Sequence, residues 1–202
     1  MSIGEQPAPA AEARATRRIG KNNGETDMRY GILGPAMLAL ASLGAGAATA
    51  QQPAPNPLDV IPDKMPFNVP YGAPISLAQA QAAIQATMEE ANRRGWPENI
   101  AVVDPSGDLV AFVRMDGAQL ASVTIAQHKA RTAARYRRPT IIFENAMQKP
   151  GSNYILSLDD VIASRGGIPL IVDGKLIGAI GCSGATGSQD EALCKVGAAT
   201  VK

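Results

Sequence analysis

Two runs of branched aliphatic residues, separated by Asp173-Gly174, constrain the fold more than any other feature of the sequence. The runs cover residues 168–172 and 176–180, and each has the length of an ordinary strand. An Asp-Gly pair between two such runs suits the positive φ angles of a tight hairpin turn. The sequence therefore predicts an antiparallel hairpin, followed by the glycine-rich stretch 181–187.

A second hairpin and several helices complete the predicted architecture. The second hairpin pairs residues 100–103 with residues 109–113. A helix is predicted to open at Ser76, whose hydroxyl can cap its first turn with Gln79 as the reciprocal partner, and to end at Arg93-Arg94-Gly95. Further helices are predicted at about 119–136, 140–147 and 189–201. This pattern indicates the α+β class, with an antiparallel sheet of about five strands flanked by helices in a single domain.

The residues before this domain form three segments. They are an extension predicted to be disordered, a secretory signal peptide and a proline-rich linker or surface arm, at 1–27, 28–50 and 51–74. The signal peptide is indicated by Arg29, an apolar stretch and the small-residue cleavage site Ala48-Thr49-Ala50. The apolar stretch is shorter than the ~20 residues of a membrane span. We therefore expect export to the periplasm or the medium, with no stable membrane anchor.

The charge balance limits the kinds of binding partner, and the cysteine count limits the possible disulfides. Residues 51–202 carry 14 basic and 14 acidic side chains, so the domain has no overall field for nucleic acid. Cys182 and Cys194 are the only cysteines. Three states remain open from sequence: a disulfide between them, two separate buried thiols, or an intermolecular link.

Two regions could bind an anion. In stretch 181–187, glycines can turn backbone N–H groups toward one point at the start of the next helix, although a corner that binds nothing is an equal alternative. The other region is a basic cluster, for which an anion site, an oligomer interface and a solvated helix end are all open: Lys129, Arg131, Arg135, Arg137 and Arg138.

Side-chain chemistry outside these regions is sparse. Lys129 and Thr132 flank a stripe of small residues, where a side chain can reach the edge of a pocket. His128, the only histidine, falls on the opposite side of the same helix and is predicted to be exposed or at a subunit contact. No metal site is predicted, and the sequence has no recognisable Ser-His-Asp set, CxxC pair or HExxH helix.

Five ordered blocks of sequence carry a family resemblance. They are Ile100-Ala101-Val102-Val103-Asp104 with Gly107, Arg114-Met115-Asp116-Gly117-Ala118, Lys129-Ala130-Arg131-Thr132-Ala133, Gly166-Gly167-Ile168-Pro169, and residues 177–184 with Gln189-Asp190-Glu191. From residue 75 to the C-terminus, the chain resembles the GlcG/HbpS family, which is related to the C-terminal domain of PduO-type proteins. The resemblance implies an antiparallel sheet flanked by helices, assembled into dimers or rings up to octamers. In the family pattern the position of Cys182 is usually valine, and that of His128 is often not histidine.

The resemblance leads to two functional hypotheses. Exported members of the family bind haem, which makes this chain a candidate carrier, scavenger or sensor partner for haem or a similar anionic ligand. The propionates of bound haem would contact the basic cluster or the glycine-rich stretch. The haem iron would bind His128, Met115, the Thr132 hydroxyl or no protein atom. The alternative is an enzyme whose small organic acid substrate sits at 181–187, positioned by Lys129 or Arg114.

Binding is the favoured hypothesis, because the sequence shows no acid-base pair. The haem-ligand candidate is His128. The predicted ligand-binding residues are Arg114, Lys129, Thr132, Gly181, Cys182, Ser183, Gly184 and Gly187.

Overall fold

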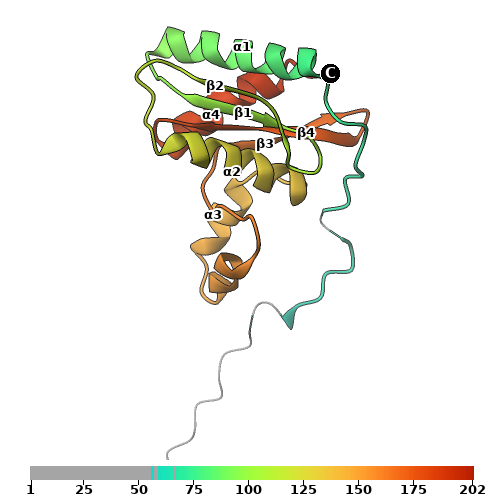
Figure 1. The fold of residues 1–202 in the computed structure, drawn as a ribbon. Helices are drawn as coiled ribbons and strands as arrows, with labels where there is room; N and C mark the ends of the chain where they lie inside the picture. Colours follow the sequence, from blue (N-terminus) through green and yellow to red (C-terminus); the bar gives the residue numbers. More distant parts are fainter. Residues whose placement is uncertain (1–55, 57–58, 66) are drawn as a thin grey trace, which may run out of the picture. The chain divides into compact units, whose positions relative to one another are not determined.

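A computed structural model describes residue 56, residues 59–65 and residues 67–202 (Figure 1). The predicted extension and signal peptide, residues 1–50, lie outside the described residues.

The sheet has four strands in the described part of the chain. The order is β2-β1-β4-β3, and every neighbouring pair of strands is antiparallel. The strands are β1 (Asn99–Val103), β2 (Leu109–Arg114), β3 (Gly167–Val172) and β4 (Lys175–Ser183). Both predicted hairpins are confirmed, and Asp173 and Gly174 have the positive φ angles expected of their turn, 49° and 73°.

The predicted number of about five strands is one too high for these residues, because the end of the proline-rich arm contributes only a short pairing. Tyr71 forms an isolated parallel bridge with Leu176, and the Gly72 N–H donates to the Leu176 carbonyl at 2.7 Å. The last residues of the predicted arm are therefore tied to the sheet, and Ile75 is buried in the core.

Within residues 67–202, four α-helices and one 3₁₀ helix accompany the sheet. They are α1 (Leu77–Arg94), α2 (Ser122–Arg135), α3 (Ile141–Met147), the 3₁₀ helix Ser152–Ser157 and α4 (Gly187–Ala198). The capping box predicted for Ser76 and Gln79 is present at the start of α1. The last helix begins before the predicted residue 189, because Thr186 and Gln189 form a second capping box.

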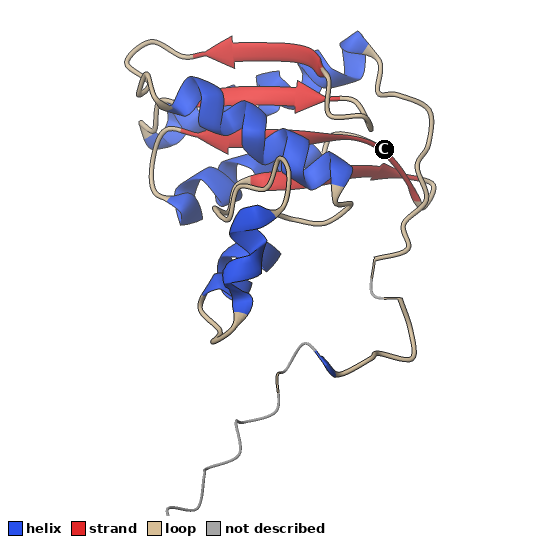
Figure 2. Cartoon of the chain, turned by 60° about the horizontal axis from the view of Figure 1, so that its bottom comes forward, coloured by secondary structure: helices blue, strands red, loops and turns tan. Residues whose placement is uncertain are grey.

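The helices cover the sheet on both faces (Figure 1). On one face, α1 and α4 pack on Ile100, Val102 and Ile180. On the other face, α2 lies across the strands and contributes the predicted stripe of small residues, Ala126, Ala130, Ala133 and Ala134 (Figure 2). Such alanines let a helix backbone lie close to a sheet.

Glycines on the sheet complete this close approach. A Cβ at Gly181 would clash with the carbonyl oxygen of Ala126, and a Cβ at Gly167 would clash with that of Lys129. Both obstacles are backbone atoms of α2, which cannot move without moving the helix. The packing of α2 on β3 and β4 is therefore sufficient reason for glycine at these positions.

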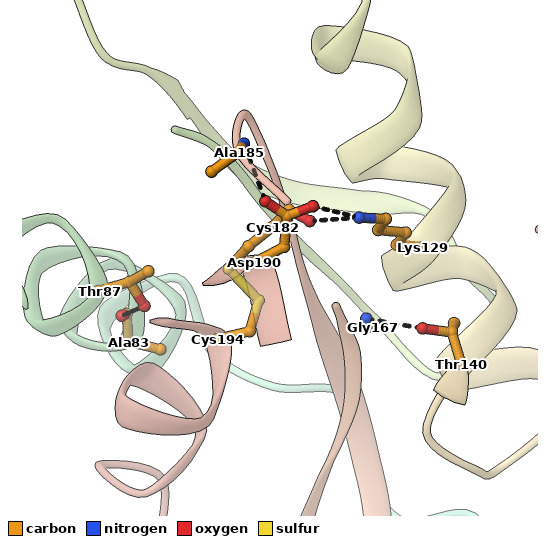
Figure 3. The surroundings of a disulfide bond; sticks show 9 residues. All are labelled: Ala83, Thr87, Lys129, Thr140, Gly167, Cys182, Ala185, Asp190 and Cys194. Atoms are coloured by element: carbon orange, nitrogen blue, oxygen red, sulfur yellow. Dashed lines mark hydrogen bonds and ion pairs between the residues drawn. A yellow bond between two sulfur atoms is a disulfide. The ribbon is translucent and has the colours of Figure 1, made fainter. Parts of the chain in front are cut away.

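The two cysteines are joined in a disulfide. Cys182 of β4 is bonded to Cys194 of α4, and their Cα atoms are 5.7 Å apart (Figure 3). This resolves the three states left open by the sequence in favour of the intramolecular bridge. The bond fastens the final helix to the central part of the sheet.

Candidate functional site

The glycine-rich corner between β4 and α4 is filled by the protein itself. A Cβ at Gly184 would clash with the carbonyl oxygen of Pro97, and one at Gly187 would meet the Arg165 side chain. The Ala185 N–H donates to Asp190 Oδ1 at 3.0 Å, and the Thr186 N–H donates to Gln189 Oε1 at 3.1 Å. These two amides are thus used internally, which weakens the predicted anion site; binding by the other residues of the corner stays a prediction.

Lys129 is buried and paired within the protein, not placed at the edge of a pocket. Its side chain is 1% exposed, and its ammonium lies 2.6 Å from Asp190 Oδ2 (Figure 3). It also donates to the Cys182 carbonyl at 3.1 Å. The long lysine stem carries the charge from α2 to the start of α4, where Asp190 neutralises it. Lys129 therefore links α2 to α4, and its role in ligand binding stays a prediction.

Thr132 and His128 have contrasting positions on α2. The Thr132 hydroxyl is buried, donates to the Asp160 carbonyl at 2.6 Å and accepts from the Ile162 N–H at 3.1 Å. Both bonds hold the loop before β3, so this oxygen already has its partners. His128 is exposed, as its place on the helix predicted.

Most residues of the predicted basic cluster have partners within the protein. Arg131 and Arg135 both pair with Asp160. Arg137 donates to the Val69 carbonyl at 3.1 Å, and its guanidinium stacks on the ring of Tyr71. Four of the five predicted basic residues, counting Lys129, are thus used to hold the fold together.

Arg138 also has contacts within the fold, but it lines an apolar cleft, and the end of α2 explains its direction. The helix ends at Arg135, and Arg137 adopts a left-handed φ of 55°, which turns the chain before Pro139. This turn sends Arg138 toward α3 and away from Asp160, the acidic partner of Arg131 and Arg135. Arg138 forms no ion pair with any residue in the described part of the chain.

Arg138 lies in an apolar cleft of about 380 Å³. We call this the Arg138 cleft; its lining residues come from the proline-rich arm, the end of α2, α3 and the 3₁₀ helix. They are Phe67, Tyr136, Arg138, Ile142, Phe143, Ala146, Tyr154, Ile155 and Leu158.

Aromatic rings surround the charge. The Arg138 guanidinium carbon lies 3.3 Å from the ring centre of Phe67 and 5.3 Å from that of Phe143. Its Nε donates to the Tyr136 carbonyl at 2.9 Å. Burial lowers the pKa of Arg138, with a further decrease from the positive charge of Arg137. A partly desolvated cation without an acidic partner stabilises an anion that enters beside it.

The remaining sequence candidates lie elsewhere. Arg114 is exposed at the end of β2. Asn99 of β1 pairs with Arg114 of β2 and with Ser183 of β4, so β1 lies between Arg114 and the glycine-rich corner. Met115 lines a different cavity of about 410 Å³, together with Met88. Within the described ranges, no three His, Cys, Asp or Glu side chains are grouped to hold a metal ion, and no helix is long and apolar enough to cross a membrane.

Sequence reasoning did not find the aromatic lining of the Arg138 cleft. The signal was present, since the chain has only eight aromatic residues, and four of them line the cleft: Phe67, Tyr136, Phe143 and Tyr154. Three of these four fall between residues 136 and 154, in a chain that is 4% aromatic. Such a local concentration indicates an apolar cluster, which in this fold lines a cleft.

Comparison with known proteins defines the family. A family model described as "Haem degrading protein HbpS-like" matches residues 75–199. This chain belongs to the HbpS-like family. The match confirms the family resemblance found in the sequence. Protein GlcG of Escherichia coli (strain K12) is 41% identical over 109 residues, which is 54% of this chain and 81% of GlcG.

Solved structures share the HbpS-like fold. The crystal structure of a PduOC:heme complex aligns with a TM-score of 0.59 and 27% identity, over 64% of this chain and 96% of that chain. A double mutant of HbpS from Streptomyces reticuli aligns with a TM-score of 0.60 and 28% identity, over 74% and 99%. The α+β class predicted from sequence is confirmed.

Proposed function

We propose that this HbpS-like chain binds haem, and that the Arg138 cleft holds it. The observation that carries the proposal is Arg138 itself, a partly buried cation that stacks on aromatic rings and has no acidic partner in the described residues. Haem combines a flat apolar ring system with two carboxylates. A ligand of this kind requires an apolar slot with a fixed cation, which is what the cleft provides.

The residues of the cleft fit the two parts of haem. Phe67, Tyr136 and Phe143 give the cleft an apolar wall for a planar ring system, and the rings of Tyr136 and Phe143 pack edge to face at 5.3 Å. Arg138 has the planar set of donors that suits a carboxylate. A pre-formed wall of this kind binds with little loss of conformational entropy.

Two lining residues carry an oxygen that haem iron accepts, Tyr136 and Tyr154. The Tyr136 hydroxyl already donates to the Asp159 carbonyl at 2.7 Å. Tyr154 is 47% exposed and comes from the 3₁₀ helix. We therefore take Tyr154 as the candidate iron ligand, in place of His128, Met115 and Thr132.

The cleft favours binding over catalysis. Its lining includes no carboxylate and no histidine, so it has no group for general acid-base chemistry near neutral pH. Bound haem would itself supply any redox chemistry. The chain's own contribution is to hold the ligand, consistent with a carrier, a scavenger or a sensor partner.

We also propose that the protein works as a homo-oligomer, as the family resemblance implies.

We further propose that the protein is exported to the periplasm or the medium. Two features support export: the signal peptide predicted at residues 28–50, and the Cys182–Cys194 disulfide, since disulfides persist in oxidising compartments. Cell fractionation with N-terminal sequencing tests export. The expected result is a mature chain outside the cytoplasm that begins near Gln51; an uncleaved cytoplasmic chain would contradict it.

Haem binding is tested by titrating haem into the purified protein and recording the visible spectrum. The expected result is a saturable shift of the haem absorption band at micromolar haem. Serum albumin and lysozyme at equal concentration serve as haem-binding and non-binding references. An unchanged haem spectrum would contradict the proposed function.

A further inference from the structure

A buried carboxyl group lies next to the Lys129–Asp190 pair. Glu98, the residue before β1, is 0% exposed. Neither of its carboxyl oxygens has a hydrogen-bond partner in the described part of the chain. Gly184 lies beside this carboxyl group, since a Cβ at Gly184 would be 3.1 Å from Glu98 Oε2. A charged carboxylate without partners is costly at such a place.

The charges around Glu98 do not balance if it is ionised. Asp190, from α4, and Lys129, from α2, are the charged groups that act on it. Asp190 already accepts from Lys129 through Oδ2 and from the Ala185 N–H through Oδ1. Two buried carboxyl groups therefore share one buried cation. A proton on one of them makes the group of three neutral.

We propose that Glu98 is a proton-binding site of the folded protein: at neutral pH it carries a proton that faces Asp190, and the neutral trio of Glu98, Asp190 and Lys129 fastens β1, α2 and α4 to one another. This inference is independent of haem binding. It gives the glycine-rich corner a chemical role that does not depend on the anion site predicted there.

The direction of the pKa shift agrees with this arrangement. Burial, and after it the negative charge of Asp190, raise the pKa of Glu98 from 4.5 to about 9, although Lys129 acts in the opposite direction. The folded state therefore keeps a proton that the unfolded chain loses at about pH 4.5. The stabilisation is complete below the unfolded pKa, and it is lost as pH rises toward the folded pKa of about 9.

The test compares the wild type with Glu98→Gln in chemical denaturation at a series of pH values from 5 to 9. Glutamine has the shape and neutrality of the protonated acid. Relative to Glu98→Gln, the folding constant of the wild type is expected to fall about tenfold per pH unit in the middle of this window and less steeply toward pH 9. Glu89→Gln, the same change at an exposed glutamate of α1, is the control and should follow the wild type. Parallel curves for the wild type and Glu98→Gln would overturn the proposal.

A second measurement needs no variant at the site. Unfolding of the wild type at pH 7 in weakly buffered solution should release about one proton per chain, because the folded state holds a proton that the unfolded chain does not. Absence of proton release, or proton uptake, would overturn the proposal even if Glu98→Gln fails to fold.

Discussion

The guanidinium carbon of Arg138 lies 3.3 Å from the ring centre of Phe67, a residue 71 positions earlier in the sequence. The contact brings the end of the proline-rich arm to the segment that links α2 and α3. An arginine stacked in this way is oriented but not neutralised. The ligand proposed for this cleft would supply the missing negative charge.

Removal of the Lys129 charge tests whether this residue has a structural role. Lys129→Met would leave Asp190 buried without its cation, and we expect a loss of about 3 to 5 kcal/mol in the free energy of unfolding. Urea denaturation measures it. The folded fraction should bind haem as the wild type does. A stable variant with weakened haem binding would show that Lys129 contacts the ligand instead.

The packing of α2 on β4 predicts unequal effects at two glycines of the same corner. Gly181→Ala pushes against the backbone of Ala126 and should cost about 1 to 3 kcal/mol or more. Gly187→Ala meets side-chain atoms of Arg165 and Glu144 and no backbone atom, so its cost should be distinctly smaller. Thermal unfolding of the two variants makes the comparison. Equal costs would contradict the packing account.

The disulfide predicts a response to reductant. The two cysteines are 12 positions apart in the sequence. A disulfide that closes a loop of this size typically adds about 3 kcal/mol to the free energy of unfolding. Reduction should lower the denaturation midpoint of the wild type, and Cys194→Ser should start at the lower value and not respond. If reductant affects both proteins equally, the bridge does not form in solution.

The choice of Tyr154 as iron ligand predicts a spectral difference. Tyr154→Phe keeps the ring and removes the oxygen, so the haem complex should lose any absorption that arises from a phenolate bound to iron. His128→Ala should leave the spectrum unchanged, since His128 is exposed on α2 and does not line the cleft. A spectrum that changes in His128→Ala and not in Tyr154→Phe would identify His128 as the iron ligand instead.

Local chemistry accounts for the parts of the fold that could be predicted from sequence. The capping box of Ser76 and Gln79 and the turn at Asp173-Gly174 depend on residues within a few positions of one another. The exposure of His128 followed from helix periodicity alone. These features need no knowledge of the tertiary structure.

The candidate site depends on partners distant in sequence, and prediction from sequence failed there. Lys129 is buried because Asp190, 61 residues later, neutralises it. Of the basic residues near it, only Arg138 turns into an apolar cleft, and that follows from the left-handed turn at Arg137. The sequence showed that the cluster at residues 129–138 is basic, but it could not show which residue pairs with which partner.

Haem titration of Arg138→Gln, next to Arg114→Gln, tests the central claim most directly. Arg114 is exposed, lies outside the cleft and was itself a candidate from sequence, so the two changes remove the same charge at two places. The account predicts that Arg138→Gln weakens haem binding about tenfold or more, the equivalent of about 1.4 kcal/mol, while Arg114→Gln binds as the wild type does. Wild-type affinity in a folded Arg138→Gln variant would contradict it.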